Sequence, residues 1–155
     1  MTRLRAVTTL AAVVLALTGC GSASPTGPET RARATGLFAA RTPYLGDNSR
    51  ISALVAKVGA APDGEFTIAL HTTTVPLGLT VNLKHPVKPF RDTDFREPAT
   101  LLLGLIGNAD RVTFTAGSDS YTLTASAASA AVGFEVKRLG QDRQALADYL
   151  GKTAD

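Results

Sequence analysis

The sequence predicts an α+β domain: a small antiparallel sheet of two hairpins with helices packed on one face, in the order α-ββ-α-ββ-α-α. Two observations predict it. Segments with apolar residues at helical spacing alternate along the chain with paired segments in which apolar and polar residues alternate. Each pair of alternating segments encloses residues typical of turns. At 155 residues, the chain is long enough for one domain of this kind.

The first helix is expected over residues 48–58. Asp47 or Asn48 can cap its N-terminus, and Gly59 can end it. Its apolar residues recur at i, i+3, i+4 and i+7, which places them on one stripe: Ile51, Leu54, Val55 and Val58.

Two hairpins are expected next. Residues 66–71 and 77–83 alternate in polarity on either side of a turn that contains Pro76 and Gly78. Residues 112–115 and 121–123 repeat the pattern around a turn at 117–119.

The polar, proline-containing segment 84–98 predicts a long loop between the hairpins, followed by a nearly apolar and therefore central helix that starts at Pro98. Gly107 and Asn108 end this helix. An alanine-rich helix to about Val132 and a last helix near 141–150 complete the expected elements.

The N-terminus resembles a bacterial lipoprotein signal. Arg3 and Arg5 precede an apolar run of about a dozen residues, and Leu17-Thr18-Gly19 lead to Cys20. The run is shorter than the roughly 20 apolar residues of a membrane span. We therefore expect residues 1–19 to be a signal peptide. Cys20, the single cysteine of the chain, is then the site of lipid attachment.

Lipid attachment would hold the protein on the extracytoplasmic face of the cell membrane, because two acyl chains suffice for stable anchoring. It would also leave no free thiol for catalysis or metal binding. Residues 20–36 carry no aromatic or large aliphatic side chain after Cys20, which predicts a flexible tether. The remaining residues, 37–155, are expected to form a single domain.

Charge argues against nucleic acid as a partner. Arg3 and Arg5 account for two of the 16 basic residues, which leaves 14 against 13 acidic ones. No basic stripe with interleaved aromatic residues is present.

Three segments resemble a bacterial family of domains of unknown function that occurs in small lipoproteins and behind the membrane parts of BlaR-type sensor metallopeptidases. The segments are Leu37-Phe38 followed by residues 42–49 (TPYLGDNS), residues 76–81 (PLGLTV), and residues 102–106 with Asn108, Asp110 and Val112. The resemblance implies an accessory or sensory role outside the cytoplasm, without catalytic residues. The HExxH helix of the larger relatives is missing from this sequence, so their peptidase activity does not carry over.

The best candidate binding surface is the segment with Tyr44, Gly46, Asp47 and Asn48, which combines an aromatic ring with the amides of a helix N-terminus that could hold an anion or a peptide carboxylate. The alternative is a capped helix start with Tyr44 packed over the first turn. Arg91, in the polar loop, marks a second candidate surface.

No metal site, cofactor site or catalytic group is expected. His71 and His85 lack the further ligands of a zinc site, and Asp92, Asp94 and Glu97 lack the pattern of a calcium loop. The sequence thus predicts a non-enzymatic binding, sensory or accessory domain whose partner is an envelope protein or a small molecule. A small envelope hydrolase and a structural assembly partner of a membrane protein remain the alternatives.

Overall fold

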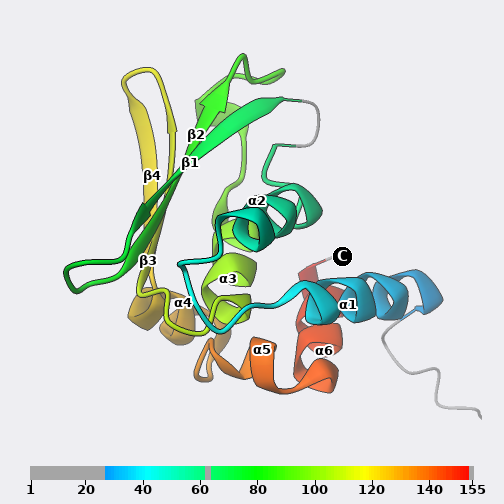
Figure 1. Ribbon diagram of the computed structural model, residues 1–155. Helices are drawn as coiled ribbons and strands as arrows, with labels where there is room; N and C mark the ends of the chain where they lie inside the picture. Colours follow the sequence, from blue (N-terminus) through cyan, green and yellow to red (C-terminus); the bar gives the residue numbers. More distant parts are fainter. Residues whose placement is uncertain (1–26, 62–63, 154–155) are drawn as a thin grey trace, which may run out of the picture.

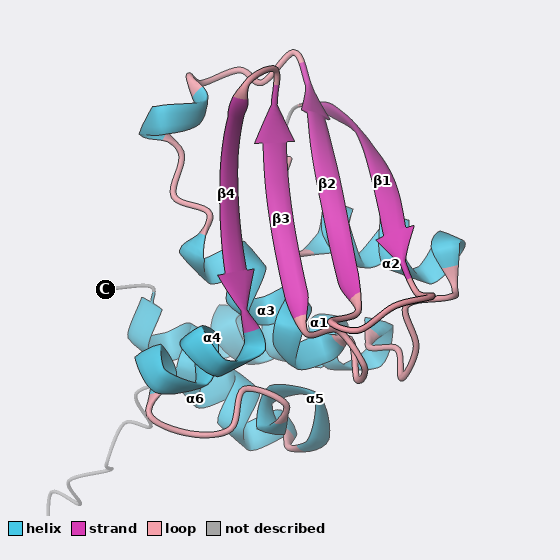
Figure 2. Ribbon diagram, turned by 90° about the vertical axis from the view of Figure 1, so that its left-hand side faces the viewer, coloured by secondary structure: helices cyan, strands magenta, loops and turns pink. Residues whose placement is uncertain are grey.

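The computed structural model describes residues 27–61 and 64–153. The expected signal peptide, Cys20 and the first part of the expected tether lie outside the described residues. A four-stranded sheet is covered by helices on one side only (Figure 1), and no helix lies in front of the strands in the view onto the opposite face (Figure 2). The predicted α+β class, with helices packed against the sheet, is confirmed.

The sheet has the strand order β1-β2-β3-β4. Its strands are β1 Glu65–His71, β2 Gly78–Lys84, β3 Arg111–Ala116 and β4 Asp119–Thr124. Both predicted hairpins are present: β1 pairs with β2 and β3 with β4, each pair antiparallel.

The two hairpins meet through a parallel pair, so the sheet is mixed and not antiparallel throughout as expected. Gly78 lies opposite Arg111 and Asn82 opposite Thr115. The connection from β2 to β3 explains the direction, because it contains a helix, α3 Arg96–Leu105, and such a crossover returns the chain to run parallel. Alternation of polarity within each strand carries no information on this direction.

Helix α3 lies at the centre of the domain, as its apolar sequence predicts. It begins at Arg96, two residues before the expected start, and every residue from Pro98 to Leu105 is buried. On the same side of the sheet, β2 and β3 bury the apolar half of their alternating residues: Leu79, Val81, Leu83, Val112 and Phe114. This helix and the inner face of the sheet form the main part of the core.

Helix α2, Asn48–Lys57, matches the first expected helix, and Asp47 is its cap. The alanine-rich helix is α4, Ala125–Val132, capped by Thr124 and ended by Gly133 at a φ of 79°. The last helix is α6, Arg143–Thr153.

A helix replaces much of the expected tether. Helix α1, Pro28–Ala40, starts eight residues after Cys20 and packs along α6 (Figure 1). Ala34 and Leu37 are 1% and 0% exposed, and Arg33 forms an ion pair with Glu97 at 2.6 Å. The absence of large apolar residues before Leu37 was misleading, because a small side chain such as that of Ala34 lets two helices approach closely. The folded region therefore includes residues 28–36, which the sequence assigned to the tether.

A short helix, α5 Arg138–Gln141, was not expected. It crosses α3 at a close approach between two glycines: a Cβ on Gly140 would lie 2.5 Å from the carbonyl oxygen of Gly104, and one on Gly104 would lie 2.7 Å from the Cβ of Leu139. Any larger residue at either position would separate the two helices.

Candidate functional site

The segment that leaves α3, residues 106–110, is bound by the chain that connects α1 to α2. The amide of Thr42 donates to the carbonyl of Leu105 at 3.0 Å, and the amide of Gly107 donates to the carbonyl of Thr42 at 2.9 Å. The Asn108 side chain accepts a further bond, at 2.8 Å, from the amide of Leu45. Segments separated by about 60 residues in the sequence are thereby fixed to each other.

Asp110 binds the same segment to the first hairpin. Its carboxylate accepts a hydrogen bond from the amide of Leu77 at 2.8 Å, and its own amide donates to the carbonyl of Leu77 at 2.9 Å. The carbonyl of Asp110 also accepts from the amide of Ala125, at the start of α4. One residue thus sets the start of β2 beside the start of β3.

Lys137 completes this arrangement from the C-terminal part of the chain. Its Nζ donates to the carbonyls of Leu103 and Ile106, at 2.8 and 2.9 Å, and also to that of Ala109. A cation at this place satisfies carbonyls at the end of α3 and is favoured by the helix dipole. Burial lowers the pKa of Lys137, while the nearby charges of Asp110 and Glu135 act in the opposite direction. We call residues 106–110, with Lys137, the α3 junction.

The segment predicted to bind a ligand has a mainly structural role at its second half. The Asp47 carboxylate accepts from the amide of Arg50 at 3.0 Å and forms an ion pair with its guanidinium at 3.2 Å. The carboxylate of Asp47 therefore already occupies the N-terminus of α2. This favours the alternative of a capped helix start over the binding of an external anion by free amides. Gly46 and Asn48 are exposed beside it.

Tyr44 does not pack over the first turn of α2 as the alternative expected. It is 67% exposed, one of the few large apolar side chains on the surface. Arg91 lies elsewhere, on a single helical turn at Phe90–Asp92 beyond the end of the sheet (Figure 2). No hydrogen bond or ion pair connects Tyr44 to Arg91 among the described residues. The two candidate surfaces are thus separate.

A groove with basic side chains lies next to the Tyr44 segment. It has a volume of about 550 Å³ and lies between the chain that follows α1 and the ends of α3 and α5. Arg41, Arg50 and Lys137 line it, and no acidic residue does. Arg41 stacks over the ring of Phe38 at 4.0 Å and donates to the Phe38 carbonyl, which holds its guanidinium in place. We call this the basic groove. Its cations come from three separate parts of the chain, so no local pattern predicts it.

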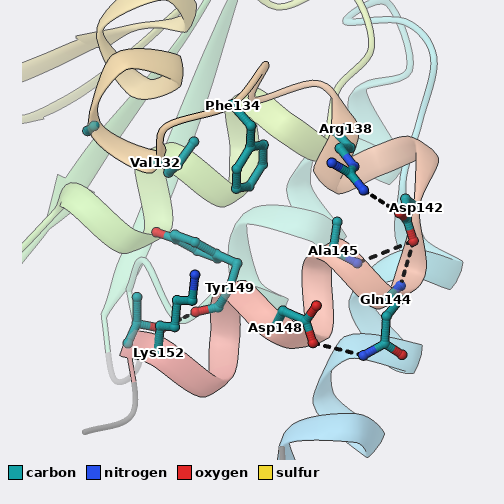
Figure 3. A pocket seen from close by; sticks show the side chains of 11 residues that line it. Val132, Phe134, Arg138, Asp142, Gln144, Ala145, Asp148, Tyr149 and Lys152 are labelled. Atoms are coloured by element: carbon teal, nitrogen blue, oxygen red, sulfur yellow. Dashed lines mark hydrogen bonds and ion pairs between the residues drawn. The ribbon is translucent and has the colours of Figure 1, made fainter. Parts of the chain in front are cut away.

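A second pocket, of about 360 Å³, lies between the end of α4, α5 and α6 (Figure 3). Phe134 and Tyr149 contribute aromatic surface, and burial raises the pKa of Tyr149. Asp142 pairs with Arg138 at 3.3 Å and accepts from the amides of Gln144 and Ala145. The bonds from those amides, the Ala145 one foremost, and Arg138 hold the pKa of Asp142 below its ordinary value. The charged groups of this pocket are thus largely engaged in holding α6 to α5.

The histidines do not come together with other ligating side chains. His71 shares a hydrogen bond with Thr80 at 3.1 Å, and residues 27–61 and 64–153 contain no cluster of three His, Cys, Asp or Glu suited to a metal ion. Within the same residues, no helix is long and apolar enough to cross a membrane.

Comparison with known proteins identifies the family. The sequence model of a domain of unknown function, DUF4825, matches residues 37–126. The chain belongs to this family. No curated protein and no solved structure matches the chain.

The DUF4825 region contains α2, the whole sheet and all of residues 106–110, whereas Lys137, α5 and α6 lie outside it. The three segments on which the family resemblance rests are thus the ones that meet at the α3 junction. Their polar side chains, Asn108 and Asp110, bind backbone amides and position the elements around them.

Replacing Lys137 by Met tests the α3 junction. Met keeps an unbranched side chain of nearly the same length but removes all three donors, and each buried carbonyl left unpaired costs roughly 1–3 kcal/mol. We expect the free energy of unfolding to fall by at least about 2 kcal/mol in urea denaturation. The exposed Lys152→Met is the matched control and should have little effect; equal stability of both variants would contradict the role of Lys137.

Proposed function

We propose that this DUF4825 protein is a lipid-anchored domain on the extracytoplasmic face of the cell membrane, where it binds a partner and performs no chemistry of its own. The observation that carries the proposal is the short interval between Cys20 and α1. Cys20 ends a sequence that resembles a lipoprotein signal, and the first residue of a helix belonging to the domain follows eight positions later.

This interval limits where the domain can be. Eight residue steps span at most about 28 Å, whatever conformation they adopt. Helix α1 is fixed to the rest of the domain by the buried Ala34 and Leu37, so the tether ends where the domain begins. A lipid on Cys20 would therefore keep the domain close to the membrane, within reach of the outer parts of membrane proteins.

The basic groove is the surface that best suits a binding function. Arg41 stands at its border and forms no ion pair among the described residues, Arg50 lines it while pairing with Asp47 at 3.2 Å, and Tyr44 is exposed on the adjoining segment. The guanidinium group of Arg41 favours a carboxylate or a phosphate, and an exposed aromatic ring adds apolar contact area next to it. We infer that the partner presents an acidic group, such as a peptide carboxylate, to this groove.

The resemblance to domains of small lipoproteins and to those behind the membrane parts of BlaR-type sensor metallopeptidases supports an accessory or sensory role. In both settings the domain would stand outside the cytoplasm beside a membrane. The family description itself names no activity.

Replacement of Cys20 by Ser tests the anchor. Serine cannot form the thioether to the lipid, so we expect the protein to leave the membrane fraction or to accumulate with its signal uncleaved. Fractionation of cells and mass spectrometry of the N-terminus measure this. A neighbouring substitution, Ser22→Ala, is the control and should leave the protein anchored; processing and anchoring of Cys20→Ser as in the wild type would contradict the proposal.

A photo-crosslinking residue at position 44 in the anchored protein tests the binding surface. We expect it to capture one envelope protein, and we expect Arg41→Glu with Arg50→Glu to abolish that capture by reversing the charge of the groove. The same probe at position 91 is the matched control on the other candidate surface. Capture at position 44 that persists after charge reversal, or capture only at position 91, would contradict the proposed surface.

A further inference from the structure

The outer edge of β1 is open. β1 lies at the margin of the sheet and pairs with β2 on one side only (Figure 2). In the described part of the chain, no other segment donates to its backbone or accepts from it. Every second residue of this strand therefore directs an amide and a carbonyl outward, which is a template for a further strand.

β1 also lacks the features that usually protect an edge strand. Its central residues, 66–70, include neither a charged residue nor a proline, and all seven residues pair with β2 without interruption. Its inward side chains Phe66, Ile68 and Leu70 are only half-buried, because the helices do not extend over this margin of the sheet. An added strand would cover their exposed parts.

The opposite edge has charged groups near it. The chain from Phe90 to Arg96 passes on the β4 side of the sheet (Figure 2), and the buried ring of Phe95 stacks on Phe114 at 4.8 Å and lies 6.1 Å from the ring of Tyr121. The same segment places the ion pair of Asp94 and Arg96, at 2.6 Å, near that tyrosine. Charges beside a strand discourage pairing with another chain. The two edges of one sheet thus differ in their capacity to accept a strand.

We propose that β1 pairs with β1 of a second copy of this chain, antiparallel and about a two-fold axis at Ile68. Ile68 is the central residue of the strand. In this register Glu65 lies opposite His71 of the second copy, Phe66 opposite Leu70, and Thr67 opposite Ala69. In this register odd-numbered residues lie opposite odd-numbered ones, and even-numbered residues opposite even-numbered ones. The two residues of each pair therefore direct their backbone amides to the same side of their strands. Hydrogen bonds can form in this register whichever alternate set of amides points outward.

The side chains of β1 are complementary to themselves in this register. On the outer face, the carboxylate of Glu65 meets the imidazole of His71 at both ends of the pair, and the small Thr67 and Ala69 meet in between. On the inner face, Phe66 packs against Leu70 and Ile68 against its own copy. Polar pairing at both ends and apolar matching in the same register favour a second copy over an unrelated strand.

The interface is small, so the membrane matters to it. A strand of seven residues is about 24 Å long, and one strand pair is a small contact beside the roughly 800 Å² per partner of a typical stable complex. Association in dilute solution is therefore weak. Confinement to a membrane, which rests on the proposed anchor, raises the effective concentration of one copy near another.

Cysteine pairs test the register in the full-length protein in its native membrane. Thr67 and Ala69 are exposed, so Thr67→Cys/Ala69→Cys should leave the fold intact. Opposed residues of two strands lie about 4.5–5.5 Å apart, within the range of a disulfide, whereas diagonal ones lie about 7–8 Å apart. We expect mild oxidation to convert the double variant into a covalent homodimer, and either single variant to remain largely monomeric.

Three controls decide the result. The wild-type chain gives the background from any Cys20 that has not received a lipid, and Ser120→Cys/Thr122→Cys places the same pair on the outer face of β4, where we expect no dimer. Adding His71→Glu to the β1 pair sets two carboxylates opposite each other and should lower the dimer yield several-fold; adding Glu65→Lys as well should restore it.

Equal yields from β1 and β4, no dimer from β1, or a cross-link to another protein would overturn the proposal. Fractionation of the Cys20→Ser variant tests the lipid anchor separately. Failure of the anchor proposal can therefore be told apart from failure of the dimer proposal.

Discussion

The fold depends on how the polar backbone at the end of α3 is satisfied. This helix is buried on all sides from Pro98 to Leu105, so the carbonyls of its last turn cannot turn to water as those of a surface helix do. Lys137 supplies three donors, and the backbone of Thr42 supplies another. A central apolar helix contributes most to the core, and it is tolerated there because these partners exist.

The same bonds set the topology of the sheet. Asp110 holds the backbone of Leu77 from two sides, directly before β2 and β3 begin to run parallel. The Asn108 side chain accepts a hydrogen bond from the amide of Leu45, a buried residue shortly before the start of α2. Asn108 and Asp110, which belong to the family pattern, thus explain the architecture of this DUF4825 domain, and neither is part of the surfaces proposed for binding: the basic groove, the Tyr44 segment and the edge of β1.

Elements with a local cause were predictable from the sequence. The stripe of Ile51, Leu54 and Val55 specifies α2, and Gly133 ends α4 where it was expected. Features that depend on distant segments were not. A single Lys137 gives no pattern, Ala34 is too small to mark a buried helix, and alternation in β2 and β3 does not reveal that they are parallel. For the candidate site, the cap at Asp47 was predictable from the segment, whereas the sequence left open whether Tyr44 is packed or exposed, and the cations of the groove come from different elements. The role of Cys20 stays a prediction.

Hydrogen exchange of single amides tests the α3 junction most directly. The amides of Leu45 and Leu77 lie outside helices and strands, and each donates to one side chain of the junction. If the junction holds the domain together, both amides exchange only on global unfolding, as slowly as the amides at the centre of α3. Exchange of Leu45 and Leu77 at the rate of exposed loop amides, such as that of Arg91, would contradict this account.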